Sequence, residues 1–196
     1  MTTASPALIL ENVRLPRQPS ESALLNFSAT VGEKILILGA NGCGKTTLAE
    51  AICGYLMVAT GKIGRCSHIG YVPQQPLLPG SLTVRQYFNQ LATLCKNDAD
   101  IEACINSFNL SQHTSRKIND LSRGWQQRIN LAQAWLGNPQ LLLLDEPQTA
   151  LDPDGMSILK IAIEKTDAAV LVFAPANTGC EMLIDNHLNY NSLCSL

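Results

Sequence analysis

The chain has few charged residues and no excess of either sign. Of its 196 residues, 15% are charged and 46% are hydrophobic, and the formal net charge is −2. This composition excludes intrinsic disorder, which combines low hydrophobicity with high charge. It also gives no global positive field that would attract nucleic acid or an anionic membrane surface. We therefore expect a folded protein that does not bind nucleic acid.

Paired cysteines, long apolar runs and a leader pattern are also lacking. The seven cysteines contain no C-x-x-C pair and form no His/Cys cluster with zinc spacing, which favours reduced thiols in the cytosol. No apolar run approaches the roughly 18 residues that cross a bilayer. The first residues, 1–6, show no basic run followed by an apolar stretch, so no secretory signal is expected. These absences indicate a soluble cytoplasmic protein that reaches a membrane only through a protein partner.

Hydrophobic patterning predicts one α/β domain. Ile35-Leu36-Ile37-Leu38 is a continuous apolar run followed by glycines, which is typical of a strand buried on both faces. The pattern turns helical over 83–117, so we expect a helical insert. The expected domain spans 1–196, with a core of about 1–75 and 119–196 and an insert of about 76–118. The expected strands are 7–13, 24–30, 34–38, 141–145 and 168–173, with a hairpin or strand in 61–72. The expected helices are 45–56, 122–136 and 152–165. The chain after residue 173 is expected to be irregular.

Residues 39–46 match the phosphate-binding pattern Gly-x4-Gly-Lys-[Ser/Thr]. Glycines let successive N–H groups point inward, and the helix that follows presents its positive dipole end to a phosphate. Lysine then reaches the β- and γ-phosphate oxygens, and the threonine hydroxyl binds Mg²⁺. A chance match is expected in only about one such chain in a hundred. The predicted nucleotide-binding residues are Gly39, Ala40, Asn41, Gly42, Cys43, Gly44, Lys45, Thr46 and Thr47.

Two carboxylates end a second apolar strand. Leu141-Leu142-Leu143-Leu144 delivers Asp145 and Glu146 to the carboxyl end of a strand, the edge where open α/β sheets bind ligands. Asp145 is predicted to hold Mg²⁺, and Glu146 to polarise an attacking water as general base. An isolated Asp-Glu pair is more often solvated. The phosphate loop about 100 residues upstream favours the catalytic interpretation.

Five motifs together resemble the ATP-binding cassette (ABC) transporter ATPases. In order along the chain they are the phosphate loop, Tyr71-Val72-Pro73-Gln74, Leu-Ser-x-Gly-x-Gln-Gln-Arg at 121–128, Leu-Leu-Leu-Asp-Glu-Pro at 142–147 and Thr149-Ala150-Leu151-Asp152. The resemblance implies a P-loop ATPase core with a mixed or parallel sheet, an antiparallel β-subdomain and a helical subdomain. It implies ATP and Mg²⁺ as cofactors, and Gln74 as a residue that contacts Mg²⁺ and the attacking water.

The same resemblance implies two kinds of protein partner. One is a second ATPase subunit, identical or different, whose phosphate loop faces Ser122 and Gly124 across a head-to-tail dimer, with Asp152 coupling the two sites. The other is a transmembrane permease, gripped by an exposed apolar groove on the helical insert, which keeps the protein on the inner face of the cell membrane. An absent Asn-Lys-x-Asp motif argues against a GTPase on the same core.

Three departures from the family pattern leave questions open. Arg123-Gly124-Trp125 replaces the usual Gly-Gly-Gln and looks like the exporter-type branch, with a weaker resemblance to the haem-exporter ATPase of cytochrome c maturation. Trp125 either stacks at the dimer interface or anchors its own helix. Pro175 stands where the family has a histidine that contacts the γ-phosphate, and Asn177 is a candidate to replace that histidine. The first loop has no aromatic side chain to stack on adenine, and Arg17 is a candidate for that contact. A regulatory subunit with weak or no hydrolysis is the alternative function.

Overall fold

The protein is described by a computed structural model that covers residues 6–19, 21–95 and 100–193. Its centre is a five-stranded parallel sheet in the order β5 (Ile69–Val72), β6 (Leu141–Asp145), β7 (Ala169–Ala174), β3 (Lys34–Leu38) and β8 (His187–Asn189). A second, antiparallel sheet has the order β2 (Leu25–Thr30), β1 (Pro6–Arg14) and β4 (Thr60–Arg65). The predicted α/β fold class, with its parallel sheet and antiparallel β-subdomain, is confirmed.

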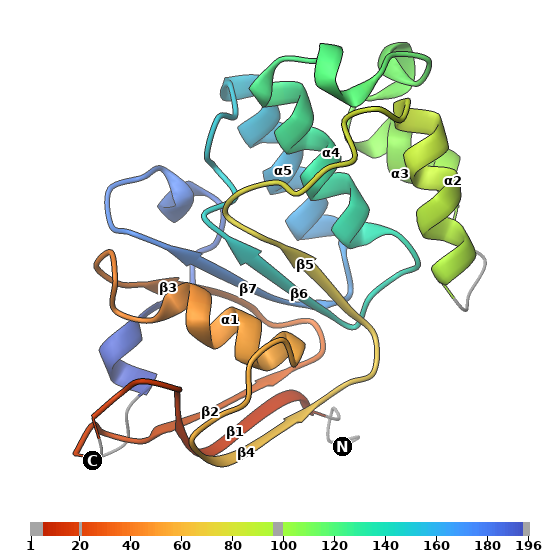
Figure 1. Cartoon of the computed structure of the whole chain (residues 1–196). Helices are drawn as coiled ribbons and strands as arrows, with labels where there is room; N and C mark the ends of the chain where they lie inside the picture. Colours follow the sequence, from red (N-terminus) through yellow and green to blue (C-terminus); the bar gives the residue numbers. More distant parts are fainter. Residues whose placement is uncertain (1–5, 20, 96–99, 194–196) are drawn as a thin grey trace, which may run out of the picture.

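Helices lie on both faces of the parallel sheet (Figure 1). Helix α1 (Lys45–Cys53) lies between the two sheets, whereas α4 (Arg123–Trp135) and α5 (Pro153–Lys165) cover the opposite face. Helices α2 (Val84–Leu94) and α3 (Ile101–Ser107) pack beside α4. No helix within the described ranges is long and apolar enough to cross a membrane. Short 3₁₀ turns are η1 (Ser111–His113), η2 (Ile118–Asp120), η3 (Cys180–Met182) and η4 (Tyr190–Leu193).

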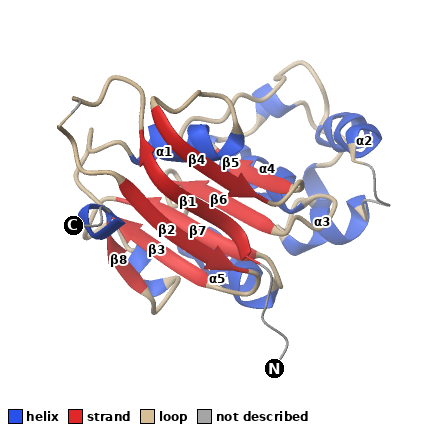
Figure 2. Cartoon of the chain, turned by 90° about the horizontal axis from the view of Figure 1, so that it is seen from below, coloured by secondary structure: helices blue, strands red, loops and turns tan. Residues whose placement is uncertain are grey.

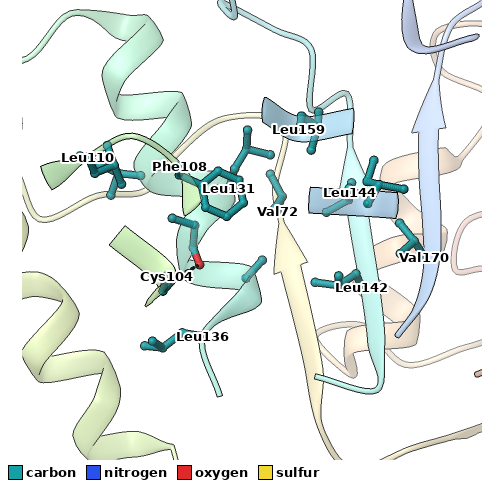
Figure 3. Close-up of a cluster of buried hydrophobic side chains, with 14 of the residues drawn as sticks. Val72, Cys104, Phe108, Leu110, Leu131, Leu136, Leu142, Leu144, Leu159 and Val170 are labelled. Atoms are coloured by element: carbon teal, nitrogen blue, oxygen red, sulfur yellow. Dashed lines mark hydrogen bonds between the residues drawn. The ribbon is translucent and has the colours of Figure 1, made fainter. Parts of the chain in front are cut away.

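Strand β6 explains why a run of four leucines ends at the predicted site. All five of its residues are buried, and successive side chains point to opposite faces of the sheet. Leu142 and Leu144 pack towards α4 and α5, as Figure 3 shows, while Leu141 and Leu143 join the core around α1. Two hydrophobic cores therefore fix the position of β6, and Asp145 leaves its end in a defined place.

Two expectations about the elements were wrong, and one pair of alternatives is decided. Helix α1 ends at Cys53 and not near residue 56, because Gly54 adopts a left-handed conformation with φ of 86° that terminates it. Of the hairpin and the strand expected in 61–72, the strand is confirmed: β4 and β5 belong to different sheets, which lie one over the other in the view of Figure 2. The segment after β7 is not wholly irregular: β8 pairs in parallel with β3, from Leu36 opposite His187 to Leu38 opposite Asn189. Three residues are too few to show strand periodicity.

The two ends of the helical segment meet at one point on the core. Thr83 and Lys117 form an antiparallel bridge, and the amide of Ile118 donates to the carbonyl oxygen of Leu82 at 2.9 Å. Helix α2 begins with a capping box, in which the Thr83 hydroxyl accepts from the amide of Gln86 and the Gln86 side chain accepts from the amide of Thr83. The helical segment therefore leaves and rejoins the core at two backbone segments that are hydrogen-bonded to each other.

The described cysteines are free thiols: Cys43, Cys53, Cys66, Cys95, Cys104 and Cys180. Cys194, the seventh, lies outside the described residues.

Candidate functional site

The predicted phosphate loop connects the end of β3 to the start of α1. Gly42 and Gly44 have φ of 79° and 112°, a left-handed conformation that favours glycine and turns neighbouring N–H groups towards one side. Gly44 is the N-cap of α1, and no side chain caps this end. The amides of Lys45, Thr46 and Thr47 therefore have no partner of their own in the helix and are available to an anion.

Lys45 lies folded against the same loop. Its side chain is buried, and its ammonium donates to the carbonyl oxygens of Gly39 at 2.7 Å and Ala40 at 2.9 Å. An ammonium has three N–H donors, so one remains for a phosphate oxygen. Asn41 is exposed at the tip of the loop, whereas Cys43 is half-buried and packs on the core around α1. Cys43 therefore contributes to the packing of the loop on the core.

Tyr190, in η4, supports the phosphate loop from below, and nothing in its sequence context predicts this. It is 3% exposed. A Cβ atom placed on Gly39 would lie 2.9 Å from the Tyr190 Cβ, and one on Gly44 would lie 2.8 Å from the Tyr190 hydroxyl. The loop therefore follows the tyrosine so closely that these two positions have room only for glycine.

Asp145 and Thr46 meet although 99 residues separate them. The Thr46 hydroxyl donates to Oδ2 of Asp145 at 2.6 Å, while Oδ1 is buried without a hydrogen-bond partner in the described chain. Burial raises the pKa of Asp145, and the bond from Thr46 opposes this. A hydroxyl beside a buried carboxylate oxygen with spare acceptor capacity suits Mg²⁺, which prefers oxygen ligands. The predicted metal pair is thus brought together.

Glu146 follows at the same edge of the sheet. It is half-buried, and its φ of 48° is uncommon for a residue with a side chain. Its amide donates to the carbonyl oxygen of Phe173 on β7 at 2.8 Å, and its own carbonyl accepts from the amide of Thr149 at 3.1 Å. These bonds hold the strained backbone in place next to Asp145.

Gln74 lies two residues beyond β5, at this edge. Val72 pairs with Leu144, so the ends of β5 and β6 are adjacent. The Gln74 side chain is exposed and makes no hydrogen bond to Thr46 or Asp145 among the described residues. The carbonyl oxygen of the preceding Pro73 accepts from Nδ2 of Asn130 at 3.1 Å, which fixes the backbone there.

Ser122 and Gly124 form a separate surface at the start of α4. Ser122 is exposed at the N-cap position, its side chain caps no amide, and it makes no hydrogen bond to the phosphate loop in the described chain. A Cβ on Gly124 would lie 3.1 Å from the carbonyl oxygen of Ala150. Gly124 thus permits a close approach between α4 and the loop that precedes α5.

Trp125 packs within its own subunit. Its ring lies 4.1 Å from the ring of His113 and 4.5 Å from the guanidinium carbon of Arg128. Of the two interpretations, these contacts support an anchor for α4.

Arg128 links α4 to α5. Its side chain is 4% exposed, and Nη2 lies 2.8 Å from Oδ1 of Asp152 and 2.8 Å from Oδ2 of Asp154. Asp152 also accepts from the amide of Gly155 at 2.7 Å as the N-cap of α5. The pKa of Asp152 is lowered, first by that amide and then by Arg128. Sequence motifs alone did not indicate this link.

The two residues predicted to replace the family's histidine and its adenine-stacking aromatic residue lie on exposed loops. Asn177 is exposed with φ of 62°, and its amide donates to Oε1 of Glu181 at 2.6 Å. Arg17 is exposed with φ of 66°. Both side chains are open to a ligand, and their predicted roles stay predictions.

A groove of about 1010 Å³ opens between α2 and the core. Tyr55, Leu77 and Leu94 line it and are largely exposed, at 70%, 88% and 79%. Leu91, Tyr71 and Gln133 contribute to its floor and walls. Large apolar side chains rarely gather on a protein surface without a partner. The expected apolar groove at the helical segment is present.

Comparison with known proteins agrees with the motifs. The family described as ABC transporter matches residues 23–149. The zinc import ATP-binding protein ZnuC of Paracoccus denitrificans is 36% identical over 156 residues, which are 76% of this chain and 61% of that protein. The Nod factor export ATP-binding protein I of Rhizobium meliloti is 35% identical over 152 residues, 69% of this chain and 45% of that protein.

Solved structures agree on the fold. The structure of an ATP binding subunit of an ABC transporter superposes with a TM-score of 0.79 and 22% sequence identity, covering 93% of this chain and 85% of that one. The chain spans between 52% and 63% of the length of the first three curated relatives. The family match covers well over half of the chain and includes the phosphate loop, the segment 121–128 and the acidic strand end. The chain therefore belongs to the ABC transporter family of ATP-binding proteins.

Proposed function

We propose that this chain is the ATP-hydrolysing subunit of an ABC transporter. The observation that carries the proposal is the bond from Thr46 to Asp145, because it joins the phosphate loop to the acidic strand end. Lys45 and the amides of α1 would bind the phosphates, and Glu146 would act as general base. Mg²⁺ held by Thr46, Asp145 and Gln74 would neutralise charge that develops on the phosphate oxygens.

Ser122 and Gly124 would complete the site of a second subunit. They lie at an uncapped helix N-terminus, a surface that suits an anion, yet they make no hydrogen bond to the phosphate loop in the described chain. A head-to-tail dimer would place this surface against the γ-phosphate bound by the partner. The second subunit is either another copy or a related ATPase, and the position of Asp152 between α4 and α5 suits a role in coupling the two sites.

The groove beside α2 would bind a permease. Its apolar lining supports a helix of a membrane protein as the occupant, with residues 76–118 acting as a helical insert in a single domain. The protein would then work at the cytoplasmic face of the membrane. Leu94→Glu is expected to reduce co-purification with a permease encoded beside it, whereas Met57→Glu, at an exposed apolar residue outside the groove lining, should not.

The alternative is a regulatory subunit that binds ATP with weak or no hydrolysis. Pro175 favours it, since proline has no side-chain donor for the γ-phosphate.

Turnover and mass measurements on the purified chain separate the two proposals. The wild type should release phosphate from Mg-ATP, and Glu146→Gln should lower the rate at least about a hundredfold. Glu146→Gln should also double its mass by light scattering when Mg-ATP is added, while Lys45→Ala should bind no ATP. Tight ATP binding by the wild type without turnover, alone and with the permease, supports the regulatory subunit instead.

A further inference from the structure

Helix α4 carries three amide side chains in one row. Gln127, Asn130 and Gln133, which we call the amide row, follow each other at intervals of three residues and so lie along one side of the helix. Gln127 is 2% exposed, Asn130 is 0% exposed, and Gln133 is half-buried. A buried amide is costly unless it is hydrogen-bonded, so the partners of this row are a structural requirement.

The hydrogen bonds along the row all run in one direction. The hydroxyl of Tyr87 on α2 donates to Oε1 of Gln133. Nε2 of Gln133 donates to Oδ1 of Asn130 at 2.7 Å, and Nδ2 of Asn130 donates to Oε1 of Gln127 at 3.3 Å. Each oxygen accepts from one neighbour while each nitrogen donates to the next. The orientation of every amide is therefore set by the one before it, and the bonds polarise one another.

The row ends on two backbone carbonyls. Nδ2 of Asn130 also donates to the carbonyl oxygen of Pro73 at 3.1 Å, and Nε2 of Gln127 donates to that of Pro147 at 3.0 Å. Pro73 directly precedes Gln74, and Pro147 directly follows Glu146. One row of side chains thus fixes the backbone beside both predicted catalytic residues.

The other end of the row lies at the groove. Gln133 lines the groove together with Leu91 and Leu94 of α2. Its hydrogen-bond partner Tyr87 also belongs to α2. From Gln127 to Gln133 the row spans about 9 Å along α4, at about 1.5 Å per residue. It joins the groove to the catalytic edge through hydrogen-bonded side chains alone.

We infer that the amide row is a positioning unit that ties α2 to both catalytic loops, the one at Gln74 and the one at Glu146. The inference rests on the proposed function in that these loops must carry hydrolysis. Among the described residues, the row reaches the site through hydrogen bonds to the carbonyls of Pro73 and Pro147, so its members are positioning residues. Its loss should change the turnover of bound ATP and leave ATP binding at the phosphate loop intact.

Kinetics of three variants test the inference. Asn130→Leu keeps the branching at Cγ and the number of side-chain heavy atoms but removes the central donor and acceptor, and should lower kcat about tenfold with KM for ATP within about twofold. Tyr87→Phe removes only the first donor and should lower kcat about threefold. The double variant should be no slower than Asn130→Leu alone, within about twofold, because the hydroxyl acts only through the row.

A matched control separates positioning from loosened packing. Cys104→Ala removes a buried thiol that donates to the carbonyl oxygen of Ala132 on α4 at 3.0 Å and makes no hydrogen bond to the amide row among the described residues. It should melt at a lower temperature and keep wild-type kcat. The inference is overturned if Cys104→Ala slows turnover as much as Asn130→Leu does, if KM rises in parallel, or if the effects of Tyr87→Phe and Asn130→Leu multiply.

Hydrogen exchange gives a readout that needs no activity. In the loop that Gln127 holds, the amide of Glu146 donates to the carbonyl oxygen of Phe173 on β7, and the amides of Thr149 and Leu151 donate to carbonyl oxygens within the loop. Asn130→Leu should speed their exchange about fivefold and Cys104→Ala should not. Unchanged exchange in Asn130→Leu overturns the inference whether or not ATP is hydrolysed. If Asn130→Leu speeds exchange but the wild-type protein does not hydrolyse ATP, the positioning role of the amide row is supported and the proposed function is contradicted.

Discussion

Replacing Tyr190 with alanine is expected to weaken both the fold and the binding of ATP. The ring is 3% exposed and fills the space below the phosphate loop, in contact distance of Cβ positions at Gly39 and Gly44. Its removal leaves a cavity under the loop, next to Gly39 and the left-handed Gly44. The loop should then sample conformations in which its amides no longer converge on a phosphate.

The magnitude follows from the burial. Truncating a buried aromatic residue to alanine costs about 3–5 kcal/mol, because the lost transfer free energy and the cavity add. In a protein of this size about 1 kcal/mol lowers the melting temperature by roughly 2–4 °C, so a fall of about 6–20 °C is expected. The dissociation constant for ATP should rise about tenfold or more, equivalent to about 1.4 kcal/mol.

Two controls isolate the effect on the loop. Tyr190→Phe keeps the ring below the loop and removes only the hydroxyl, so it should bind ATP within about threefold of the wild type. Phe108→Ala removes a ring that is 1% exposed in the core beside α4, so it should destabilise the fold comparably but leave ATP affinity unchanged. Melting curves and titration with a fluorescent ATP analogue measure both quantities. Equal ATP affinity in Tyr190→Ala and Phe108→Ala would refute a support role for Tyr190.

Three further outcomes are expected. Burial raises the pKa of Asp145, so the folded protein loses stability as the pH rises from about 4, the ordinary carboxylate pKa, through the raised pKa of Asp145. Asp145→Asn should therefore melt at a higher temperature than the wild type, by a margin that grows with pH over that range. The same variant should lose the stabilisation that Mg-ATP gives the wild type. Equal melting curves across that pH range would contradict this. Arg128→Met should cost about 1–2 kcal/mol, with a smaller loss in concentrated salt, because Asp152 and Asp154 are exposed partners; thermal melts at two salt concentrations measure this, and a loss independent of salt argues for packing alone. Burial raises the pKa of Cys104 to about 12 and of Cys180 to about 11, so iodoacetamide at about pH 8 should label them only after unfolding, as mass spectrometry can check.

The predictable part of the site is the part with local patterns. Strand β6 could be predicted because four consecutive leucines indicate a strand that is buried on both faces. Asp145 and Glu146 follow these leucines directly. The phosphate loop could be predicted because its spacing of glycines is specific to phosphate binding, and φ of 79° at Gly42 and 112° at Gly44 agrees with the left-handed turns that such a loop needs.

The missing part depends on contacts between distant residues. Tyr190 is a single aromatic residue after a three-residue strand, so no periodicity marks it. The amide row is visible as glutamine and asparagine on α4, but its direction and its ends depend on Tyr87, 46 residues from Gln133, and on Pro73, 57 residues from Asn130. Side-chain hydrogen bonds across such separations are products of packing, and no local pattern predicts them.

Complementation between two inactive variants tests most directly the central claim that each ATP site is shared between subunits. Lys45→Ala lacks a functional phosphate loop, and Ser122→Glu places a negative charge where the partner's γ-phosphate should lie. Each variant alone should be inactive. In a mixture, half of the dimers combine the two chains, and each such dimer has one intact site, so up to about a quarter of wild-type phosphate release should return. No recovery in the mixture, or full activity of Ser122→Glu alone, would contradict a site shared between two copies of this chain.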